Sequence, residues 1–233
     1  LGPDDILRER PQVLEQLAAF DRVLEEAAEG IADPSRPCDH PDAAALDAQS
    51  LADVAARLDL DTAAALMRRR DSQGEFAAEP SEVSLLFVAQ QRAYQRIHGG
   101  TSIRAHRADG GFSRVARGMA SELADLVVLG EAVRRIEVGD TTTTVVTSAR
   151  RLDCDHVVLA CALTAVRRMQ IDPVPPVDTA AAIEGLGYGA ITKTALQWPT
   201  RSWRAGYATT DRRVQRVYEP TVDQPGVMGI LMS

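Results

Sequence analysis

The sequence predicts an α/β chain with α+β character, built from a helical layer, an antiparallel sheet and a separate β-meander lobe. Three observations support this fold class. Apolar residues recur at helical spacing through the first hundred residues, and short strand-like runs follow from residue 126 onward. Three prolines between Pro173 and Pro176 indicate a crossing between domains. A chain of 233 residues is long enough for two modest domains with a sizeable core.

The first predicted helix begins after Pro11. Its apolar positions recur at alternating steps of four and three, and they are Val13, Leu17, Phe20, Leu24, Ala27 and Ile31. Because this spacing places all six on one side, it predicts an amphipathic helix whose apolar face meets the core. Three prolines between Asp33 and Pro41 predict a loop after it.

Capping residues predict the helices that follow. Ser50 caps a short helix, and either Asp59 or Asp61 opens the next, since all three side chains accept bonds from free N–H groups of a first turn. The strongly apolar stretch 83–94 predicts a further helix, which Gly99 ends.

The middle of the chain changes character. Gly110 and Gly111 start a helical pattern that continues to Leu123. The strand-like runs after it are 126–129, 132–138, 143–147 and 157–161. Gly139-Asp140 lies between two of them as a hairpin signal, so these runs predict an antiparallel meander. Beyond the prolines at 173–176, a short helix is expected around residues 180–186 and a strand over 190–198.

Composition excludes several function classes. The net charge of -7 argues against general affinity for nucleic acid or anionic membranes, and no apolar run approaches the roughly 18 residues of a membrane span. Cys38, Cys154 and Cys161 lack metal-site spacing, as do the histidines, so we expect no metal. Reduced thiols and a start without an export signal favour a cytoplasmic location.

Four linked stretches form an ordered pattern across about a hundred residues. They are Arg107-Ala-Asp-Gly110-Gly111, Val133-Arg-Arg-Ile136, Asp155 to Ala162, and Leu186-Gly-Tyr188-Gly189 followed by Lys193, Trp198 and Trp203. Their order resembles the flavin-containing amine oxidase family, which includes monoamine and polyamine oxidases. The lysine with aromatic residues five and ten positions later is the most specific part. Ala162 stands where the family usually has proline.

This resemblance implies a partial two-domain flavin amine oxidase fold. Residues 1–102 are then the helical part of a substrate-binding domain, 103–172 part of the FAD-binding domain, and 173–233 the sheet part of the substrate-binding domain. We expect the chain to be an internal portion of such an enzyme. No G-x-G-x-x-G turn precedes Gly99, and the C-terminal FAD segment of the family is also missing.

The resemblance also implies site residues. Lys193 is the expected catalytic residue, since the family's lysine holds a water at the reactive N5 of FAD. The expected cofactor-binding residues are Val133, Gly110, Gly111 and Arg107. Tyr188 is the expected substrate-binding residue, whereas Trp198 and Trp203 are expected in the core. Each residue also fits a plain role, such as a surface lysine, a strand valine or a helix-initiating glycine turn.

As function, the resemblance implies an FAD-dependent oxidoreductase that transfers hydride from an amine carbon to the flavin, with peroxide formation. Whether this chain binds FAD alone stays open. Two alternatives remain: a cofactor-free remnant or partner-binding module, and a related flavoenzyme acting on a carotenoid or porphyrinogen. The substrate is expected to be a small amine, and the sequence indicates neither its identity nor the oligomeric state.

Overall fold

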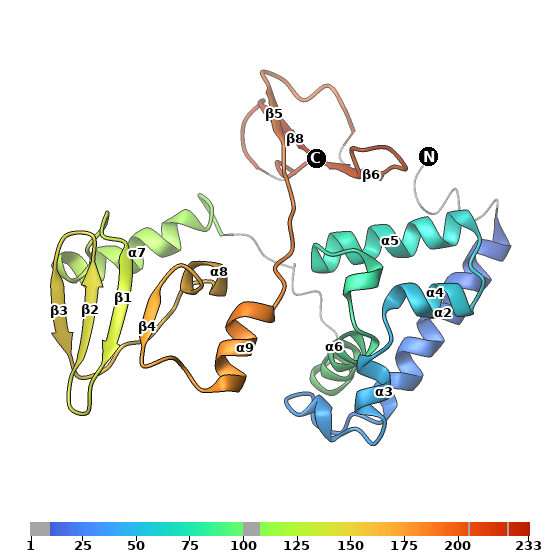
Figure 1. Cartoon of the computed structure of the whole chain (residues 1–233). Helices are drawn as coiled ribbons and strands as arrows, with labels where there is room; N and C mark the ends of the chain where they lie inside the picture. The colour runs from blue at the N-terminus through green and yellow to red at the C-terminus, as the bar shows by residue number, and fades with distance from the viewer. Residues whose placement is uncertain (1–9, 100–107, 205, 223) are drawn as a thin grey trace. The chain divides into compact units, whose positions relative to one another are not determined.

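The chain forms two compact units (Figure 1). The structure is a computed structural model, and it describes residues 10–99, 108–204, 206–222 and 224–233. Unit 1 comprises Leu1–Thr101 and Gly189–Ser233, and unit 2 comprises Ser102–Tyr188. Helices and antiparallel or mixed sheets both occur, which confirms the predicted fold class.

A helical layer forms the first part of unit 1. Its elements are α2 (Pro11–Glu29), η1 (Pro37–Asp39), α3 (Ala43–Asp47), α4 (Leu51–Arg57), α5 (Thr62–Phe76), η2 (Pro80–Glu82) and α6 (Leu85–His98). The apolar stripe of α2 is buried as expected, with Phe20 and Leu24 only 2% and 4% exposed. They join Val54 of α4 and Leu85 and Ala89 of α6 in one core cluster.

Side-chain caps fix where α4 and α5 begin. Ser50 Oγ accepts the Asp53 N–H at 3.2 Å, while Asp53 Oδ2 accepts the Ser50 N–H at 2.8 Å, which is the reciprocal capping box. Asp61, not Asp59, caps α5 by accepting the N–H groups of Ala63 and Ala64. The hydrogen bonds from Ser50 hold the pKa of Asp53 below its ordinary value.

A four-stranded antiparallel sheet closes unit 1. Its strands are β5 (Ala195–Trp198), β6 (Tyr207–Thr209), β7 (Arg216–Tyr218) and β8 (Gly229–Met232), in the order β5-β8-β7-β6. The strand expected over 190–198 is shorter, because β5 pairs with β8 only from Ala195 to Trp198. Arg70 of α5 joins the helices to this sheet region through the carbonyls of Thr210 and Arg212.

Unit 2 is a helix followed by a second sheet. Its elements are α7 (Ser113–Leu123), η3 (Ala124–Leu126), β1 (Val133–Val138), β2 (Thr143–Thr147), β3 (Arg151–Cys154), α8 (Leu163–Val166), β4 (Gln170–Asp172) and α9 (Val177–Gly185). The sheet order is β3-β2-β1-β4. The expected meander is present in β1, β2 and β3, whereas β4 runs parallel to β1.

Two of the expected strands in unit 2 are wrong. Residues 126–129 and 157–161 are apolar but form no strand, and Leu126 belongs to η3. The third strand of the meander is β3 instead. Thr147 Oγ1 accepts the N–H groups of Ala149 and Arg150, and this tight turn returns the chain directly beside β2.

Helix α9 packs with unit 2. Arg167, just after α8, donates to the carbonyls of Ile183 and Leu186. The observed division at Tyr188 therefore lies beyond the boundary we expected at residue 172. The roles of the two units as substrate and FAD domains stay a prediction.

The described part of unit 2 buries little apolar surface. Its fully buried apolar side chains are Ile136 and Val166. Helix α7 has no buried residue, and its apolar stripe, which includes Val115, Met119 and Leu123, is exposed. Within the described residues, no helix is both long and apolar enough to cross a membrane.

Candidate functional site

Lys193 lies in unit 1, in the extended segment that leads into β5. Its side chain is exposed, and within the described residues it has no hydrogen bond or ion pair. Its neighbour Thr194 exchanges two backbone hydrogen bonds with Ser233, at 2.9 and 3.0 Å, so the backbone at this point is held by the end of β8. Lys193 is also the single lysine among the 26 Lys and Arg residues of the chain.

The two tryptophans of the motif contact each other. The ring centroids of Trp198 and Trp203 are 5.4 Å apart with an interplanar angle of 75°, an edge-to-face arrangement. The Trp203 Nε1–H donates to Glu219 Oε2 at 3.0 Å. Trp198 is 37% exposed and Trp203 is half-buried, so the pair lies at the rim of its sheet and not in the core.

Gly110 and Gly111 form the turn before α7. Their φ angles are +71° and +83°, a region that glycine adopts without the steric cost of a Cβ. A Cβ on Gly110 would lie 2.6 Å from Arg114 Cδ, whereas no heavy atom lies within 4 Å of the corresponding position on Gly111. The backbone of Gly111 is therefore open to close approach. Arg107 lies outside the described residues.

Val133 opens β1 in unit 2. It pairs with Thr147 of β2, and a register shift separates this pair from the pair formed by Arg135 and Val146. On the other side, the parallel ladder to β4 begins only at Arg135. The backbone of Val133 therefore lies outside that ladder. A main-chain contact from Val133 to the adenine of FAD, if there is one, requires such an unpaired strand edge.

Tyr188 has a structural contact that the sequence does not indicate. Its hydroxyl oxygen accepts the backbone N–H of Leu163 at 2.9 Å, at the first residue of α8. The ring is half-exposed. Tyr188 therefore anchors α8, and a substrate contact would have to come from its ring.

The predicted site residues are divided between the two units. Gly110, Gly111, Val133 and Tyr188 belong to unit 2, and Lys193 belongs to unit 1. None of these five lines either of the two hollows described next. Their functional roles stay predictions.

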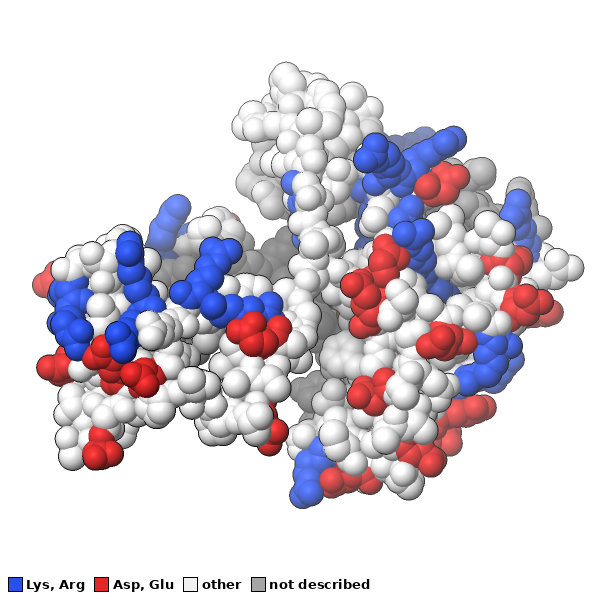
Figure 2. Space-filling view, in the orientation of Figure 1, with Lys and Arg blue, Asp and Glu red and all other residues white. Residues whose placement is uncertain are grey.

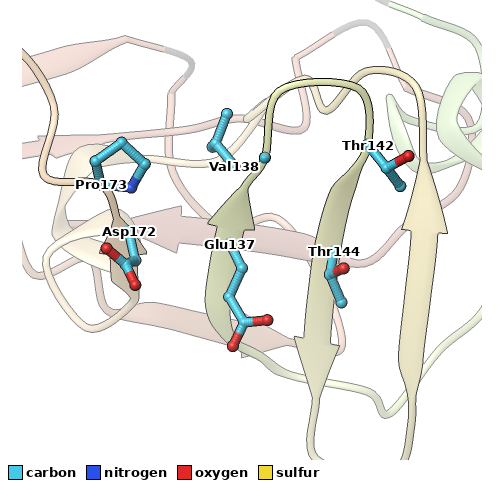
Figure 3. Close-up of a pocket in the computed structure, with 7 residues that line it drawn as sticks. Glu137, Val138, Thr142, Thr144, Asp172 and Pro173 are labelled. Carbon is cyan, nitrogen blue, oxygen red and sulfur yellow. The ribbon is translucent and has the colours of Figure 1, made fainter.

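One hollow lies beside the β1–β2 hairpin of unit 2 and has a volume of about 410 Å³ (Figure 3). Glu137 and Asp172 contribute its carboxylates, and both are already ion-paired. Arg135 lies 3.2 Å from Glu137 and 3.4 Å from Asp172, and Arg151 lies 2.6 Å from Glu137. Figure 2 shows both charges interspersed over these strands. This alternation describes a solvated sheet face with satisfied charges.

A second hollow of about 420 Å³ lies within unit 1, between α2, α5 and α6. Phe20, Leu24 and Val88 contribute apolar surface, and Arg68 and Arg92 lie among its charged lining. Both arginines are held by Asp21, at 2.7 and 3.1 Å. Among the described residues, no group of His, Cys, Asp or Glu side chains in either unit is placed to hold a metal ion.

Sequence reasoning missed Glu219 entirely. It is a carboxylate whose side chain is only 4% exposed, and it collects Trp203, Arg201 and Thr221 around it. No motif marks it, because Arg201 and Trp203 are distant from it in the sequence and meet it only in the folded sheet region.

Comparison with known proteins identifies the family. A family model described as flavin containing amine oxidoreductase matches residues 5–225. AofH of Mycobacterium tuberculosis, which bears the name of a flavin-containing monoamine oxidase, is 26% identical over 168 residues, covering 66% of this chain and 36% of AofH. The L-amino-acid oxidase of Pseudechis australis is 28% identical over 134 residues, covering 53% of this chain and 26% of that protein.

Solved structures show the same fold. A putrescine oxidase bound to putrescine superposes with a TM-score of 0.82 at 22% identity, covering 95% of this chain and 51% of the oxidase. The chain thus spans about half the length of that structure. At 22% sequence identity, this similarity shows a shared fold and nothing more. Because the family model matches nearly the whole sequence, the chain belongs to the flavin-containing amine oxidoreductase family.

Proposed function

We propose that this chain supplies the substrate-domain helices, and the lysine beside the flavin, of an FAD-dependent amine oxidase. The single observation that carries the proposal is the position of Lys193. It is the one lysine among 26 basic residues, and it stands at the family's lysine position with Trp198 and Trp203 in register.

The described residues fit parts of the cofactor. Gly111 offers an open backbone at the start of α7, and the backbone of Val133 lies outside the β1–β4 ladder, so both suit main-chain contacts to the nucleotide. The exposed ammonium group of Lys193 suits a contact with the flavin ring of FAD. Gly185, Gly187 and Gly189 do not suit the pyrophosphate, because they run from the last residue of α9 toward β5, and a dinucleotide turn leads from a strand into a helix.

When bound, the flavin supplies the hydride acceptor, so that an amine carbon is oxidised and oxygen becomes peroxide. The chain's part is to orient and to stabilise. Lys193 presents three N–H donors on a flexible stem, which suit an ordered water and developing negative charge. Thr194, the next residue, is hydrogen-bonded to Ser233 at the end of β8, so the backbone that carries the Lys193 side chain is fixed.

The test begins with the 233-residue chain, incubated with FAD and desalted. Retained visible absorbance bands of oxidised flavin would support the proposal, and small amines such as putrescine should then yield peroxide. Lys193→Met should keep the bands and lower the rate by about 10²-fold or more, the loss typical of one removed electrostatic donor. Arg213→Met is the matched control, since Arg213 is an exposed basic residue of the same sheet region.

Two outcomes would contradict the proposal. A colourless protein would show that the chain does not hold FAD, and would favour the cofactor-free alternative. A coloured protein whose peroxide rate is equal in Lys193→Met and Arg213→Met would remove Lys193 from the chemistry.

A further inference from the structure

Glu219 is a buried carboxylate at the end of β7, in unit 1. The Trp203 Nε1–H donates to its Oε2 at 3.0 Å, and the Thr221 hydroxyl donates to its Oε1 at 2.8 Å. Arg201 Nε lies 3.6 Å from Oε1. A carboxylate that is only 4% exposed is costly to bury unless it is paired, and here one cation and two hydrogen bonds satisfy it.

The partners of Glu219 hold the segment that enters β8. Arg201 Nε donates to the Met228 carbonyl at 2.9 Å, and its Nη2 donates to the Gln224 carbonyl at 3.0 Å. The Arg201 backbone N–H donates to the Val227 carbonyl at 3.1 Å. Arg201 therefore binds the loop 224–228 at three points, with its guanidinium beside Glu219.

The first residue of β8 fits the same cluster. A Cβ on Gly229 would lie 2.6 Å from Trp203 Cζ2 and 2.7 Å from Arg201 Cγ, so that only glycine leaves room for both side chains. The next residue, Ile230, donates its backbone N–H to Thr221 Oγ1 at 3.4 Å. Glu219 is thus linked to two successive residues of β8 through its own partners.

The register of β8 against β5 determines the position of the Lys193 backbone. Strand β5 pairs with β8 over only four residues, from Trp198 opposite Gly229 to Ala195 opposite Met232, and the Thr194–Ser233 bonds extend this ladder to the residue after Lys193. Short ladders specify register weakly. A slip by one residue would turn side chains to the other face and displace the strand by about 3.3 Å.

We propose that Glu219 is a positioning residue for Lys193, and that it acts by fixing the register of β8 against β5. Its carboxylate holds Trp203 and Arg201 against the start of β8, and the ladder carries that register to Thr194. This inference rests on the proposed role of Lys193 beside the flavin. The Glu219 cluster itself needs no cofactor to form, so it is testable in the chain alone.

The experiment compares Glu219→Ala and Glu219→Gln in the 233-residue chain with Glu25→Gln. Glu25 is the matched control, since it is a half-exposed carboxylate of unit 1, on α2, that pairs with Arg92 of α6. The readouts are amide hydrogen exchange along 190–198 and 229–233, and the acetylation rate of Lys193, whose side chain is the single lysine amine of the chain. A third is the circular dichroism of the coupled tryptophans, the two that the chain contains.

Glu219→Ala should speed exchange along both strands by about tenfold or more, the loss expected when buried donors are left unpaired, while α2 and α6 stay protected. It should also change the Lys193 acetylation rate and the tryptophan signal. Glu219→Gln keeps one acceptor oxygen, so partial rescue is expected. Glu25→Gln should leave all three readouts unchanged, since an exposed ion pair contributes little to stability.

Unchanged exchange along β5 and β8 in Glu219→Ala would overturn the inference, and so would equal loss of protection in the helices. If Glu219→Ala does not fold, Trp203→Phe removes the N–H donor and keeps a ring. It should then speed exchange in the same two strands, and no change there would overturn the inference equally. Failure of FAD binding leaves these readouts interpretable, so the two proposals fail separately.

Discussion

Matched truncations on α2 and α7 should have very different effects. Leu24 on α2 is 4% exposed inside the core cluster, while Met119 on α7 is 63% exposed. Leu24→Ala removes three buried carbons, which at about 0.8 kcal/mol each, plus the cavity left behind, should cost about 3–4 kcal/mol. In proportion to its smaller buried fraction, Met119→Ala should cost less than about 1 kcal/mol, and the two residues have similar helix propensity.

The assay is native-state hydrogen exchange on each variant, because it reports the opening free energy of α2 and of β1 separately even if the two units unfold apart. Leu24→Ala should lower protection in unit 1, and Met119→Ala should leave both units nearly unchanged. A loss of several kcal/mol in unit 2 for Met119→Ala would refute the reasoning, since it would show that the α7 stripe is covered. Repeating the measurement at tenfold dilution would then tell whether a second copy covers it.

Three further predictions concern single positions. Ser50→Ala removes the capping box of α4 and should cost about 1 kcal/mol in urea unfolding; an unchanged midpoint would contradict the cap. Gly111→Ala should destabilise α7 by about 1 kcal/mol, because its φ of +83° is unfavourable for a residue with a Cβ. Gly118 also has open space around it but lies inside α7, so Gly118→Ala should stabilise the helix by up to about 1 kcal/mol. Equal hydrogen exchange in α7 for the two variants would refute the argument from φ. The hydrogen bond from Arg69, then that from Gln73, lowers the pKa of Glu79, so its small stabilisation exists above its ordinary pKa and is lost as pH falls through the lowered one. Glu79→Gln should therefore destabilise more at pH 7 than at pH 3, as urea midpoints at both values would show.

Local patterns predicted the helical layer well because its boundaries are local. The stripe of α2 needs only a period, and Ser50 and Asp61 satisfy N–H groups within three residues of themselves. The strands were harder. Residues 157–161 are as apolar as a strand requires, yet β3 forms at Arg151–Cys154, since the turn after Thr147 brings it beside β2. Whether a segment forms a strand depends on the strand it pairs with, and the sequence of one segment does not reveal that partner.

The same reasoning explains which proposed site residues a motif can indicate. Gly111, Val133 and Lys193 each lie just where a helix or strand ladder begins, and such positions leave backbone or side-chain groups free for a ligand. Motifs capture them because the spacing to the adjoining element is fixed along the chain. Glu219 has no such spacing, since Arg201 and Trp203 meet it only once the sheet has formed. A residue that acts by holding distant strands in register is therefore invisible to a motif, and it becomes visible as a buried charge whose every partner leads to the same strand.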